Sequence, residues 1–429
     1  MNLAYLYSLV WIFFLLFLLR NRREYMVYIY IVSLWTFSSL ASIVYGTALN
    51  LLDDLRVMPY AFLFVCLLVS FYPFYRNDKS INGITIGNWK MFKYVIVGLG
   101  VISVLPFLEN LIHVLTTYKS SNSDAISDLY YEKMSGDFDR AKYINWFSLP
   151  GRIGNSINLK FQNCSLFLLF IYLCTKENNK KIILLLLVSA LNPVLYQLNM
   201  SGRSSLVWFF LMSVLLFFIF YGFIQKKTRT LIVKVGLVAL AAGVFLISIL
   251  TLARYNNNEG ANSISLLAWV SLYIGEGSLN FNNDMWDIKV LTQGDNCFNF
   301  FKNILGFDTF TDVLERREYW GPKTGINPVR FYTFIGDIFS DIYFFVLPFI
   351  FIISVFLRRL INKSSSPSLF TLYLYFTWGC LCLTGVTCYT LKTNQSMIDM
   401  SFSLIVIALI SSKQNNSGGY IINSNERDI

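Results

Sequence analysis

Residues 235–253 read VGLVALAAGVFLISILTLA, an apolar stretch without a single charged side chain. A helix needs about 20 predominantly apolar residues to cross the hydrocarbon core of a bilayer, and this stretch has that length. Strands of membrane barrels are only about ten residues long and alternate between apolar and polar positions. The stretch therefore predicts a transmembrane helix, and the rest of the chain contains more runs of the same kind.

The composition of the whole chain agrees with this prediction. Of the 429 residues, 55% are hydrophobic and only 14% are charged, whereas soluble domains carry roughly 25% charged residues. We expect an all-α polytopic membrane domain over residues 1–412 with about eleven transmembrane helices, in a range of ten to twelve. The expected spans are residues 2–19, 26–46, 57–75, 94–115, 159–174, 182–200, 204–224, 235–253, 337–357, 368–388 and 397–412.

The net charge of +10 is explained by topology and does not require a nucleic-acid partner. Lysines and arginines are concentrated in every second loop, which is the pattern of loops on the inner side of a membrane. This distribution places the N-terminus outside, the C-terminus inside, and two large loops on the outer face. The large loops are residues 116–158 and 253–336. The polar tail, residues 413–429, is predicted to be disordered and cytoplasmic.

The second large loop directly follows the span quoted first. From Ala253 to Val329 the chain is polar and rich in aromatic residues. We expect a lid with short amphipathic helices at Ile264–Ile274 and Cys297–Leu305. An enzyme that acts on a large polar substrate at the membrane surface needs such a loop more than a channel does.

Motifs of soluble enzymes are missing from the sequence. It has no Walker loop, dinucleotide-binding fingerprint, HExxH or GxSxG motif. A single histidine excludes a multi-histidine metal site, and we expect neither a metal nor another cofactor. Of the seven cysteines, Cys297 is the one expected in an outer loop, so a disulfide within the loops is not expected.

Three arginines are expected at the outer ends of helices. Arg203 lies in the turn Ser201-Gly202-Arg203-Ser204, Arg254 closes the span 235–253, and Arg330 precedes the ninth span. A guanidinium stays charged and matches phosphate oxygens in a bidentate manner, so the three could hold a lipid-linked pyrophosphate. Each is also explained by snorkelling or by compensation of a helix dipole.

Acidic side chains are the second group of candidates. Glu109 and His113 are four residues apart, on one face of the fourth span, and could act as a base and its orienting partner. An ordinary interfacial hydrogen-bonded pair is the alternative. Glu276, between two glycines, is a further candidate base or else part of a loop turn. Asp337 and Asp341 are expected to support the site, with Arg330 as the partner of Asp337.

Several of these residues belong to motifs that resemble those of the oligosaccharide repeat-unit polymerases, the Wzy-type O-antigen and capsule polymerases of bacterial inner membranes. The resemblance rests on the Ser-Gly-Arg-Ser turn, on Arg254 with Tyr273-Ile274-Gly275 and Asn280-Phe281-Asn282, and on Tyr332-Thr333 with Asp341-Ile342-Tyr343. The span layout and the two outer loops add to it. Tyr343 departs from the family pattern, in which glycine is common at that place.

The resemblance implies a metal-independent glycosyltransferase of the bacterial inner membrane. The acceptor is a lipid-linked repeat unit, whose terminal sugar hydroxyl attacks the anomeric carbon of a chain carried on undecaprenyl pyrophosphate, which then leaves. We expect Arg203, Arg254 and Arg330 to bind the pyrophosphate and Glu276 or the Glu109–His113 pair to act as the base. The other partners implied are the lipid bilayer and a chain-length regulator.

The glycan itself is expected to contact polar and aromatic side chains of the two outer loops. These are Tyr273, Asn280 and Asn282 in the second loop and Arg152 in the first. Loop aromatics, among them Trp269, Trp286, Tyr319 and Trp320, could stack on sugar rings or anchor the loop at the interface.

Two other functions remain open. An O-antigen ligase of similar architecture would rely on a histidine within its major loop, and the second loop has none. A lipid-linked oligosaccharide flippase would have short loops and a deep basic cavity, unlike the long loops expected here.

Overall fold

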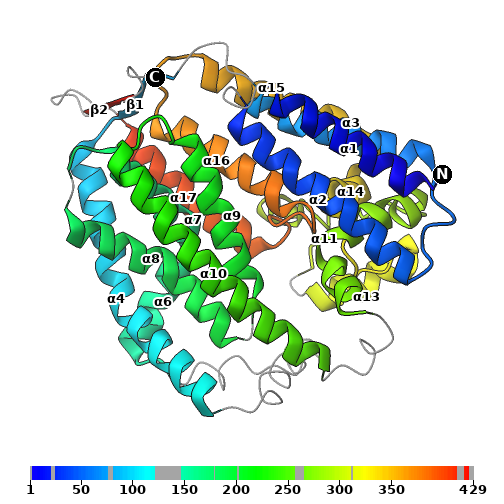
Figure 1. Cartoon of the computed structure of the whole chain (residues 1–429), viewed down its shortest axis with the longest axis horizontal. Helices are drawn as coiled ribbons and strands as arrows, with labels where there is room; N and C mark the ends of the chain where they lie inside the picture. The colour runs from blue at the N-terminus through cyan, green and yellow to red at the C-terminus, as the bar shows by residue number, and fades with distance from the viewer. Residues whose placement is uncertain are drawn as a thin grey trace. The chain divides into compact units, whose positions relative to one another are not determined.

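The protein is described from a computed structural model, which is almost entirely helical (Figure 1). The structure describes residues 2–20, 25–75, 81–120, 146–177, 179–200, 202–256, 265–310, 313–412 and 420–424. The first half contains α1 (Leu3–Leu19), α2 (Met26–Ala48), α3 (Val57–Phe71), η1 (Tyr72–Phe74), β1 (Gly83–Ile86), α4 (Trp89–Ser120), α6 (Leu149–Lys160), α7 (Gln162–Cys174), α8 (Lys180–Asn199) and α9 (Ser204–Ile219). The second half contains α10 (Lys226–Asn256), α11 (Leu266–Asn283), η4 (Met285–Asp287), α12 (Asn299–Ile304), α13 (Val313–Thr324), α14 (Thr333–Ile342), η5 (Tyr343–Phe345), α15 (Val346–Asn362), α16 (Leu369–Thr384), α17 (Asn394–Ser411) and β2 (Tyr420–Asn423).

These helices are those of an all-α membrane protein. Within the described ranges, seven are long and apolar enough to cross a bilayer, and the bent pair α6–α7 makes an eighth when counted as one span. Three of the expected spans, 2–19, 204–224 and 368–388, instead contain the shorter apolar helices α1, α9 and α16. Every segment that the sequence marks as apolar is therefore helical, but not all of these helices have full spanning length.

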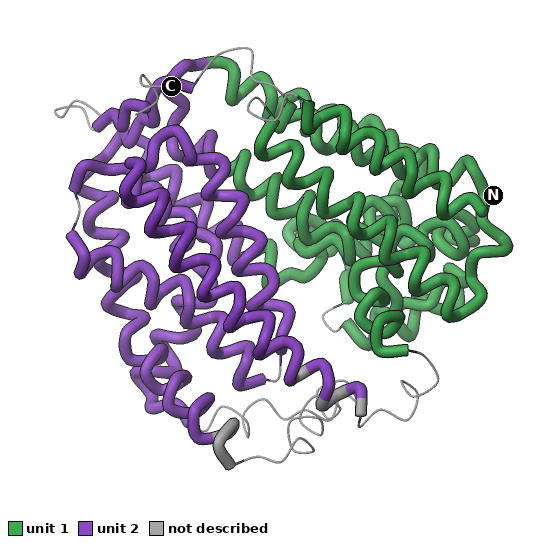
Figure 2. The backbone as a smooth tube through the Cα atoms, viewed as in Figure 1, with its two compact units in different colours: residues 1–79, 259–363, 374–397 green, residues 80–258, 364–373, 398–429 purple. Residues whose placement is uncertain are grey.

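By its internal packing the chain divides into two compact units (Figure 2), and the single membrane domain expected over residues 1–412 stays a prediction. Unit 1 comprises residues 1–79, 259–363 and 374–397, and unit 2 comprises residues 80–258, 364–373 and 398–429. Each unit is discontinuous in sequence, which hydropathy cannot reveal because it registers apolar length and not which helices pack together.

Unit 1 contains α11 as a packed helix, although it belongs to the stretch expected to form a lid. A Cβ on Gly275 would lie 2.4 Å from backbone atoms of Ala41 and Ser42 in α2, so only glycine allows the two helices to approach so closely. The hydroxyl of Ser38 also donates to the carbonyl of Ile274 at 2.7 Å. The expected helix at Ile264–Ile274 thus extends to Asn283 and forms part of the core.

Unit 2 has a ladder of buried amides and hydroxyls in its core, which we call the amide ladder: Ser103, Asn110, Asn155, Asn158, Ser165, Ser189, Asn192 and Asn199. Asn110 donates to Asn192 at 2.9 Å, and Asn192 donates to Asn155 at 3.0 Å and to Asn158 at 2.9 Å. The ladder joins α4, α6, α7 and α8. Because lipid offers no competing partners, such hydrogen bonds hold transmembrane helices together.

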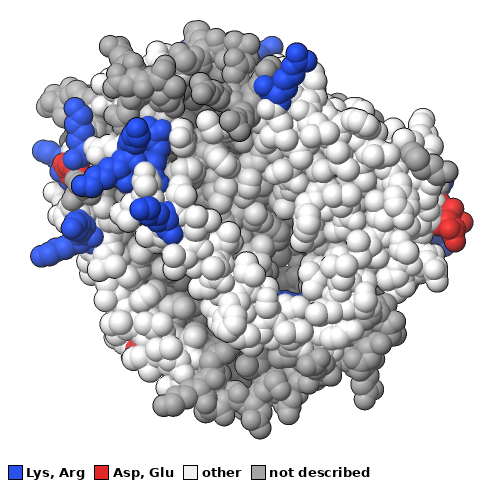
Figure 3. All heavy atoms as spheres, viewed as in Figure 1, with Lys and Arg blue, Asp and Glu red and all other residues white. Residues whose placement is uncertain are grey.

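Three basic loops meet at one end of unit 2. Lys93 at the start of α4 forms an ion pair with Glu177 in the α7–α8 turn at 2.6 Å. Glu177 also lines a small cavity with Gln225 and Thr228, where α9 leads into α10. Lysine and arginine side chains gather at this end in Figure 3, near the start of α10. The alternation of basic loops in the sequence therefore corresponds to one physical end of the unit.

A small antiparallel sheet modifies the prediction for the C-terminal tail. Residues Tyr420–Asn423 form β2, which pairs with β1 in the register Gly83 to Asn423 and Ile86 to Tyr420. The run Tyr420-Ile421-Ile422 has the β-propensity that this pairing needs. These residues are ordered where disorder was expected, and the remainder of the tail, 413–419 and 425–429, lies outside the described residues.

Candidate functional site

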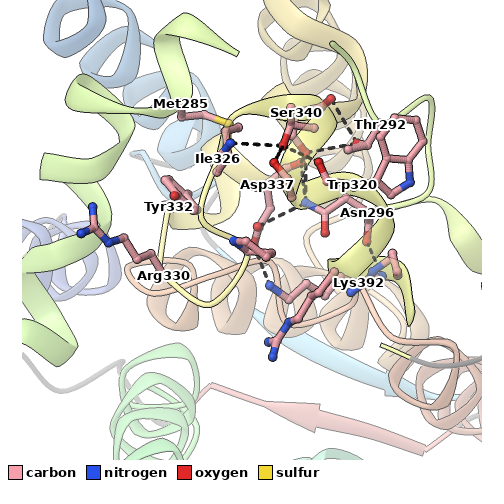
Figure 4. Close-up of a pocket in the computed structure, with 15 residues that line it drawn as sticks. Met285, Thr292, Asn296, Trp320, Ile326, Arg330, Tyr332, Asp337, Ser340 and Lys392 are labelled. Atoms are coloured by element: carbon pink, nitrogen blue, oxygen red, sulfur yellow. Dashed lines mark hydrogen bonds and ion pairs between the residues drawn. The ribbon is translucent and has the colours of Figure 1, made fainter. Parts of the chain in front are cut away.

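An open pocket, with about 590 Å³ of empty space when the solvent at its mouth is included, lies entirely within unit 1. Its walls come from the stretch between η4 and α14 and from the turn that follows α16 (Figure 4). The lining residues are Met285, Thr292, Asn296, Arg316, Arg317, Trp320, Gly321, Thr324, Ile326, Pro328, Arg330, Tyr332, Asp337, Ser340 and Lys392. Four of these side chains are cations and one is an anion, so the pocket attracts negative charge.

Helix α13 supplies two of the cations. Arg316 is only 8% exposed and donates to the backbone carbonyls of Asp295 at 3.1 Å and Asn296 at 3.3 Å. Within the described residues no carboxylate lies within ion-pair distance of its guanidinium, and burial lowers its pKa. A buried arginine without a carboxylate in direct contact is an energetically costly arrangement, which the charges of Asp337 and Asp341 offset only from a distance. An anionic ligand would relieve that cost.

Arg317 and Trp320 lie beside Arg316 on the same helix. The half-buried Arg317 side chain makes no hydrogen bond or ion pair to any part of the chain that the structure describes. The indole of Trp320 donates to the carboxylate of Asp295 at 3.1 Å, and the ammonium of Lys302 pairs with the same carboxylate. Asp295 therefore fixes the orientation of Trp320 while Arg317 is left available for a ligand.

Helix α14 presents Asp337, Ser340 and Asp341 on one face, because residues three and four positions apart are neighbours on a helix. Asp341 accepts hydrogen bonds from the backbone amides of Gly294, Asn296 and Cys297 at 3.0, 3.2 and 2.6 Å, and from the hydroxyl of Thr292. It is 4% exposed. Asp341 thus anchors the turn at 292–297, which forms one wall of the pocket.

Asp337 is the single carboxylate among the lining residues, and it lies in the middle of the group in Figure 4. Its carboxylate accepts from the backbone amide of Tyr389 at 2.6 Å and pairs with the ammonium of Lys392 at 3.3 Å. The sequence-based expectation that Arg330 is its partner is wrong. Arg330 forms an ion pair with Asp284 at 3.1 Å instead.

Lys392 lies in the short turn between α16 and α17. Burial alone would lower the pKa of its ammonium, but the surrounding groups, first among them the Asp337 carboxylate, outweigh burial, and the pKa is raised. Lys392 is therefore a cation at neutral pH. Its side chain is 25% exposed and that of Asp337 only 6%, so the lysine is the more accessible member of the pair.

Backbone strain brackets α14 on both sides. Thr333, at its first residue, has φ +67°, and Tyr343, directly after its last, has φ +55° with ψ −135°. Neither conformation suits a residue with a side chain, and strain of this kind is concentrated at functional sites. The amide of Thr333 donates to the carbonyl of Thr387 at 3.1 Å, so the turn that carries Lys392 helps to hold the strained residue.

Glu276, the expected base in the second loop, lies in α11 and is 5% exposed. Burial raises its pKa, while hydrogen bonds from Asn280 and the backbone of Phe331 oppose the rise. It is not among the residues that line the pocket. The flanking glycines do not provide a flexible turn: a Cβ on Gly277 would lie 2.5 Å from the carbonyl oxygen of Val386. Gly275 and Gly277 instead allow neighbouring segments of the chain to approach closely.

In the second loop, the residues expected to contact glycan form hydrogen bonds and ring contacts within the protein. Asn280 donates to the carbonyl of Phe331 at 3.1 Å, and Asn282 exchanges hydrogen bonds with the backbone of Arg56 at 2.7 and 2.9 Å. Both amides are buried. Tyr273 is half-buried and packs edge-on against Trp269 at 5.7 Å between ring centroids. These contacts hold chain segments together within unit 1.

Glu109, His113 and Arg152 belong to unit 2. Glu109 accepts from the backbone amide of Ser148 at 3.2 Å, and His113 shares a hydrogen bond with Asn199 at 3.0 Å and stacks on Trp146. His113 therefore ends the amide ladder, and Glu109 bonds the residue that caps α6. Arg152 is exposed in the first turn of α6.

The three arginines expected to bind pyrophosphate are divided between the units. Arg203 and Arg254 are part of unit 2, and Arg330 is part of unit 1. Arg203 donates to the hydroxyl of Thr251. Arg254 lies in the last turns of α10, and its side chain is outside the described residues. Of the three, Arg330 lines the pocket, together with the expected residues Asp337 and Trp320.

Arg316, Arg317 and Lys392 were missed by sequence reasoning. The first two occur in Glu315-Arg316-Arg317-Glu318, where mixed charges indicate a solvated loop. Lys392 occurs in a polar turn between two apolar segments. A basic pair followed three residues later by tryptophan is the one signal that could have identified the pocket.

Neither a family model, nor a curated protein, nor a solved structure matches this chain. Among the described residues there is also no cluster of histidine, cysteine and acidic side chains that could hold a metal ion. The site is therefore defined by its geometry alone, as a basic pocket in a helical membrane protein.

Proposed function

We propose that the protein is a polysaccharide polymerase that transfers a growing glycan from undecaprenyl pyrophosphate to the terminal sugar hydroxyl of a lipid-linked repeat unit. The observation that carries this proposal is Arg316, a buried guanidinium facing a pocket without a carboxylate partner. A diphosphate supplies the missing negative charge and offers oxygens for bidentate hydrogen bonds.

The other walls of the pocket suit the remainder of such a substrate. Arg317, Arg330 and Lys392 add positive charge that would stabilise a diphosphate as it leaves the sugar. Trp320 is held in place by Asp295 and presents an aromatic face of the kind that stacks on sugar rings. The largely polar stretch from 285 to 332, together with Asp337, Ser340 and Lys392, forms this pocket in a chain that is otherwise rich in apolar helices.

The proposal is tested by complementation of a host that lacks the gene. We expect Arg317→Gln to reduce long polymer and to leave single repeat units, at equal protein level in the membrane. One charge-assisted hydrogen bond contributes about 1.5–3 kcal/mol, which corresponds to roughly a tenfold to hundredfold loss in pyrophosphate affinity. Arg317 makes no structural hydrogen bond in the described chain, so its replacement leaves the fold intact.

Arg359→Gln is the matched control, because Arg359 is exposed near the end of α15 and does not line the pocket. It should leave the polymer ladder unchanged. A normal ladder in both Arg316→Gln and Arg317→Gln would contradict the proposal. In the gene deletion itself, accumulation of lipid-linked polymer would indicate a ligase, and absence of any repeat unit at the outer surface would indicate a flippase.

A further inference from the structure

Asp337 and Lys392 form an ion pair in the wall of the pocket, and binding of the donor's phosphates does not require the carboxylate of this pair. The reaction needs a base to take a proton from the acceptor hydroxyl. Among the residues lining the pocket, Asp337 is the single carboxylate. It is 4% exposed, and its ion pair with Lys392 lies at the pocket wall, so the lysine covers it.

Asp337 has contacts other than Lys392, and these would hold its carboxylate in place if the lysine moved away. The amide of Tyr389 holds one carboxylate oxygen at 2.6 Å, and the side-chain amide of Asn296 lies 3.4 Å from the other. Lys392 has no second carboxylate within ion-pair distance in the described part of the chain. An anion in the pocket therefore competes with Asp337 for the lysine, and the carboxylate stays in position when the lysine leaves.

We infer that Asp337 is the base of the transfer and that Lys392 is a positioning residue that covers it until the diphosphate of the donor draws the lysine away. This inference rests on the proposed function. Once exposed, the Asp337 carboxylate accepts the proton of the acceptor hydroxyl. The hydroxyl oxygen forms the new bond to the anomeric carbon, and the bond from that carbon to the phosphate oxygen breaks, its electron pair leaving with the diphosphate.

Transfer of Lys392 from the Asp337 carboxylate to the diphosphate would protect the base until the donor is bound. With the donor absent, the base is paired with an ammonium and shielded from water, so it cannot activate a stray hydroxyl. Occupation of the phosphate site both places the leaving group and exposes the base, which couples donor binding to proton transfer. The energy for the exchange comes from the stronger attraction of Lys392 to a multiply charged diphosphate than to a single carboxylate.

The test measures the chemical accessibility of Asp337 in purified full-length protein. A water-soluble carbodiimide with glycine ethyl ester labels exposed carboxylates, and mass spectrometry reports the labelled fraction. We expect saturating inorganic pyrophosphate to raise the labelling rate of Asp337 about tenfold. Asp341 is the internal control, because four donors from Thr292, Gly294, Asn296 and Cys297 enclose it, and it should stay unlabelled.

Two variants sharpen the test. Lys392→Gln should label rapidly at Asp337 with or without pyrophosphate. Asp337→Asn should lose turnover but bind pyrophosphate several-fold more tightly, because Lys392 no longer has a competing partner. A merely structural ion pair would not give the ligand response of the wild type. The tighter binding of Asp337→Asn follows in either case, because the substitution removes a negative charge from the pocket.

The outcomes separate this inference from the proposed function. If calorimetry shows that pyrophosphate binds while Asp337 labelling is unchanged or reduced, the inference is overturned and the pocket assignment stands. If pyrophosphate does not bind at all, both the pocket assignment and the inference fail.

Discussion

At the scale of single residues, Tyr343 combines a strained backbone with close aromatic packing. Its φ is +55° and its ψ is −135°, a conformation that glycine adopts without strain. Its ring packs against Phe339 at 4.8 Å and Phe344 at 4.2 Å between centroids. Aromatic packing therefore offsets the strained backbone at the end of α14.

This balance can be measured by comparing two substitutions. Tyr343→Ala and Tyr343→Gly both remove the ring, but only glycine also relieves the positive φ. We expect Tyr343→Gly to be more stable than Tyr343→Ala by about 1–2 kcal/mol, seen as a higher melting temperature in detergent. Equal melting temperatures for the two variants would mean that the backbone at this position is not strained.

At the scale of elements, the contact between α2 and α11 makes one part of the expected lid, Leu266–Asn283, a core helix. Gly275 lies against the backbone of Ala41 and Ser42, with no space for a Cβ. A helix that packs this closely holds Glu276, Asn280 and Asn282 in buried positions. Asn282 in turn bonds the backbone of Arg56, at the start of α3.

Substitution of this glycine separates packing from helix propensity. Gly275→Ala should destabilise unit 1 by about 1–3 kcal/mol, because the added methyl meets immobile backbone. Gly98→Ala in α4 is the control, since nothing lies within 4 Å of its Cβ position. There we expect a gain of about 0.5–1 kcal/mol from the better helix former. Thermal unfolding of the two variants in the same detergent checks both signs, and stability gained by Gly275→Ala would refute the close contact.

The apolar helices could be predicted from the sequence, but the polar half of α11 could not, and the difference has a physical reason. Apolar segments become helices in a membrane because each backbone group must be hydrogen-bonded within its own segment, so runs such as 235–253 identify their helices without tertiary information. The polar half of α11, from Gly275 to Asn283, becomes helical through packing on α2. Hydropathy cannot register that packing, and the sequence therefore gave no sign that the helix continues past Ile274.

The candidate site was predictable in the same partial way. Arg330 and Asp337 were conspicuous because charges next to apolar spans are costly. The ion-pair partners of these two residues could not be predicted, since Asp284 is 46 residues from Arg330 and Lys392 is 55 residues from Asp337. Arg316 looks like an ordinary loop charge until the fold buries it against the carbonyls of Asp295 and Asn296.

At the scale of the whole molecule, the basic loops give unit 2 a polarity along its helices. The ion pair of Lys93 with Glu177 marks one end, and the contact of Glu109 with Ser148 marks a different part of α4, sixteen residues further along the helix. If the positive-inside rule holds for this chain, the first of these ends faces the cytoplasm and α6 begins towards the outer face.

Labelling of single cysteines tests that orientation. Lys227→Cys and Arg152→Cys each place a thiol at an exposed position, in a background with Cys388→Ser; the other six native cysteines are buried. A membrane-impermeant maleimide should label Arg152→Cys in intact cells and Lys227→Cys only after the membrane is opened. Labelling of Lys227→Cys and not of Arg152→Cys in intact cells would reverse the orientation of unit 2, and labelling of both would place both positions on the outer side.

The amide ladder has a consequence for how the protein is made. Asn110 on α4 is bonded to Asn192 on α8, which is synthesised 82 residues later. During synthesis α4 therefore reaches the membrane before the side-chain amide of Asn110 has its partner on α8, and an unpaired amide is poorly tolerated in hydrocarbon. Release of α4 from the insertion machinery into lipid should consequently wait for α8, so that the two helices leave together as a bonded pair.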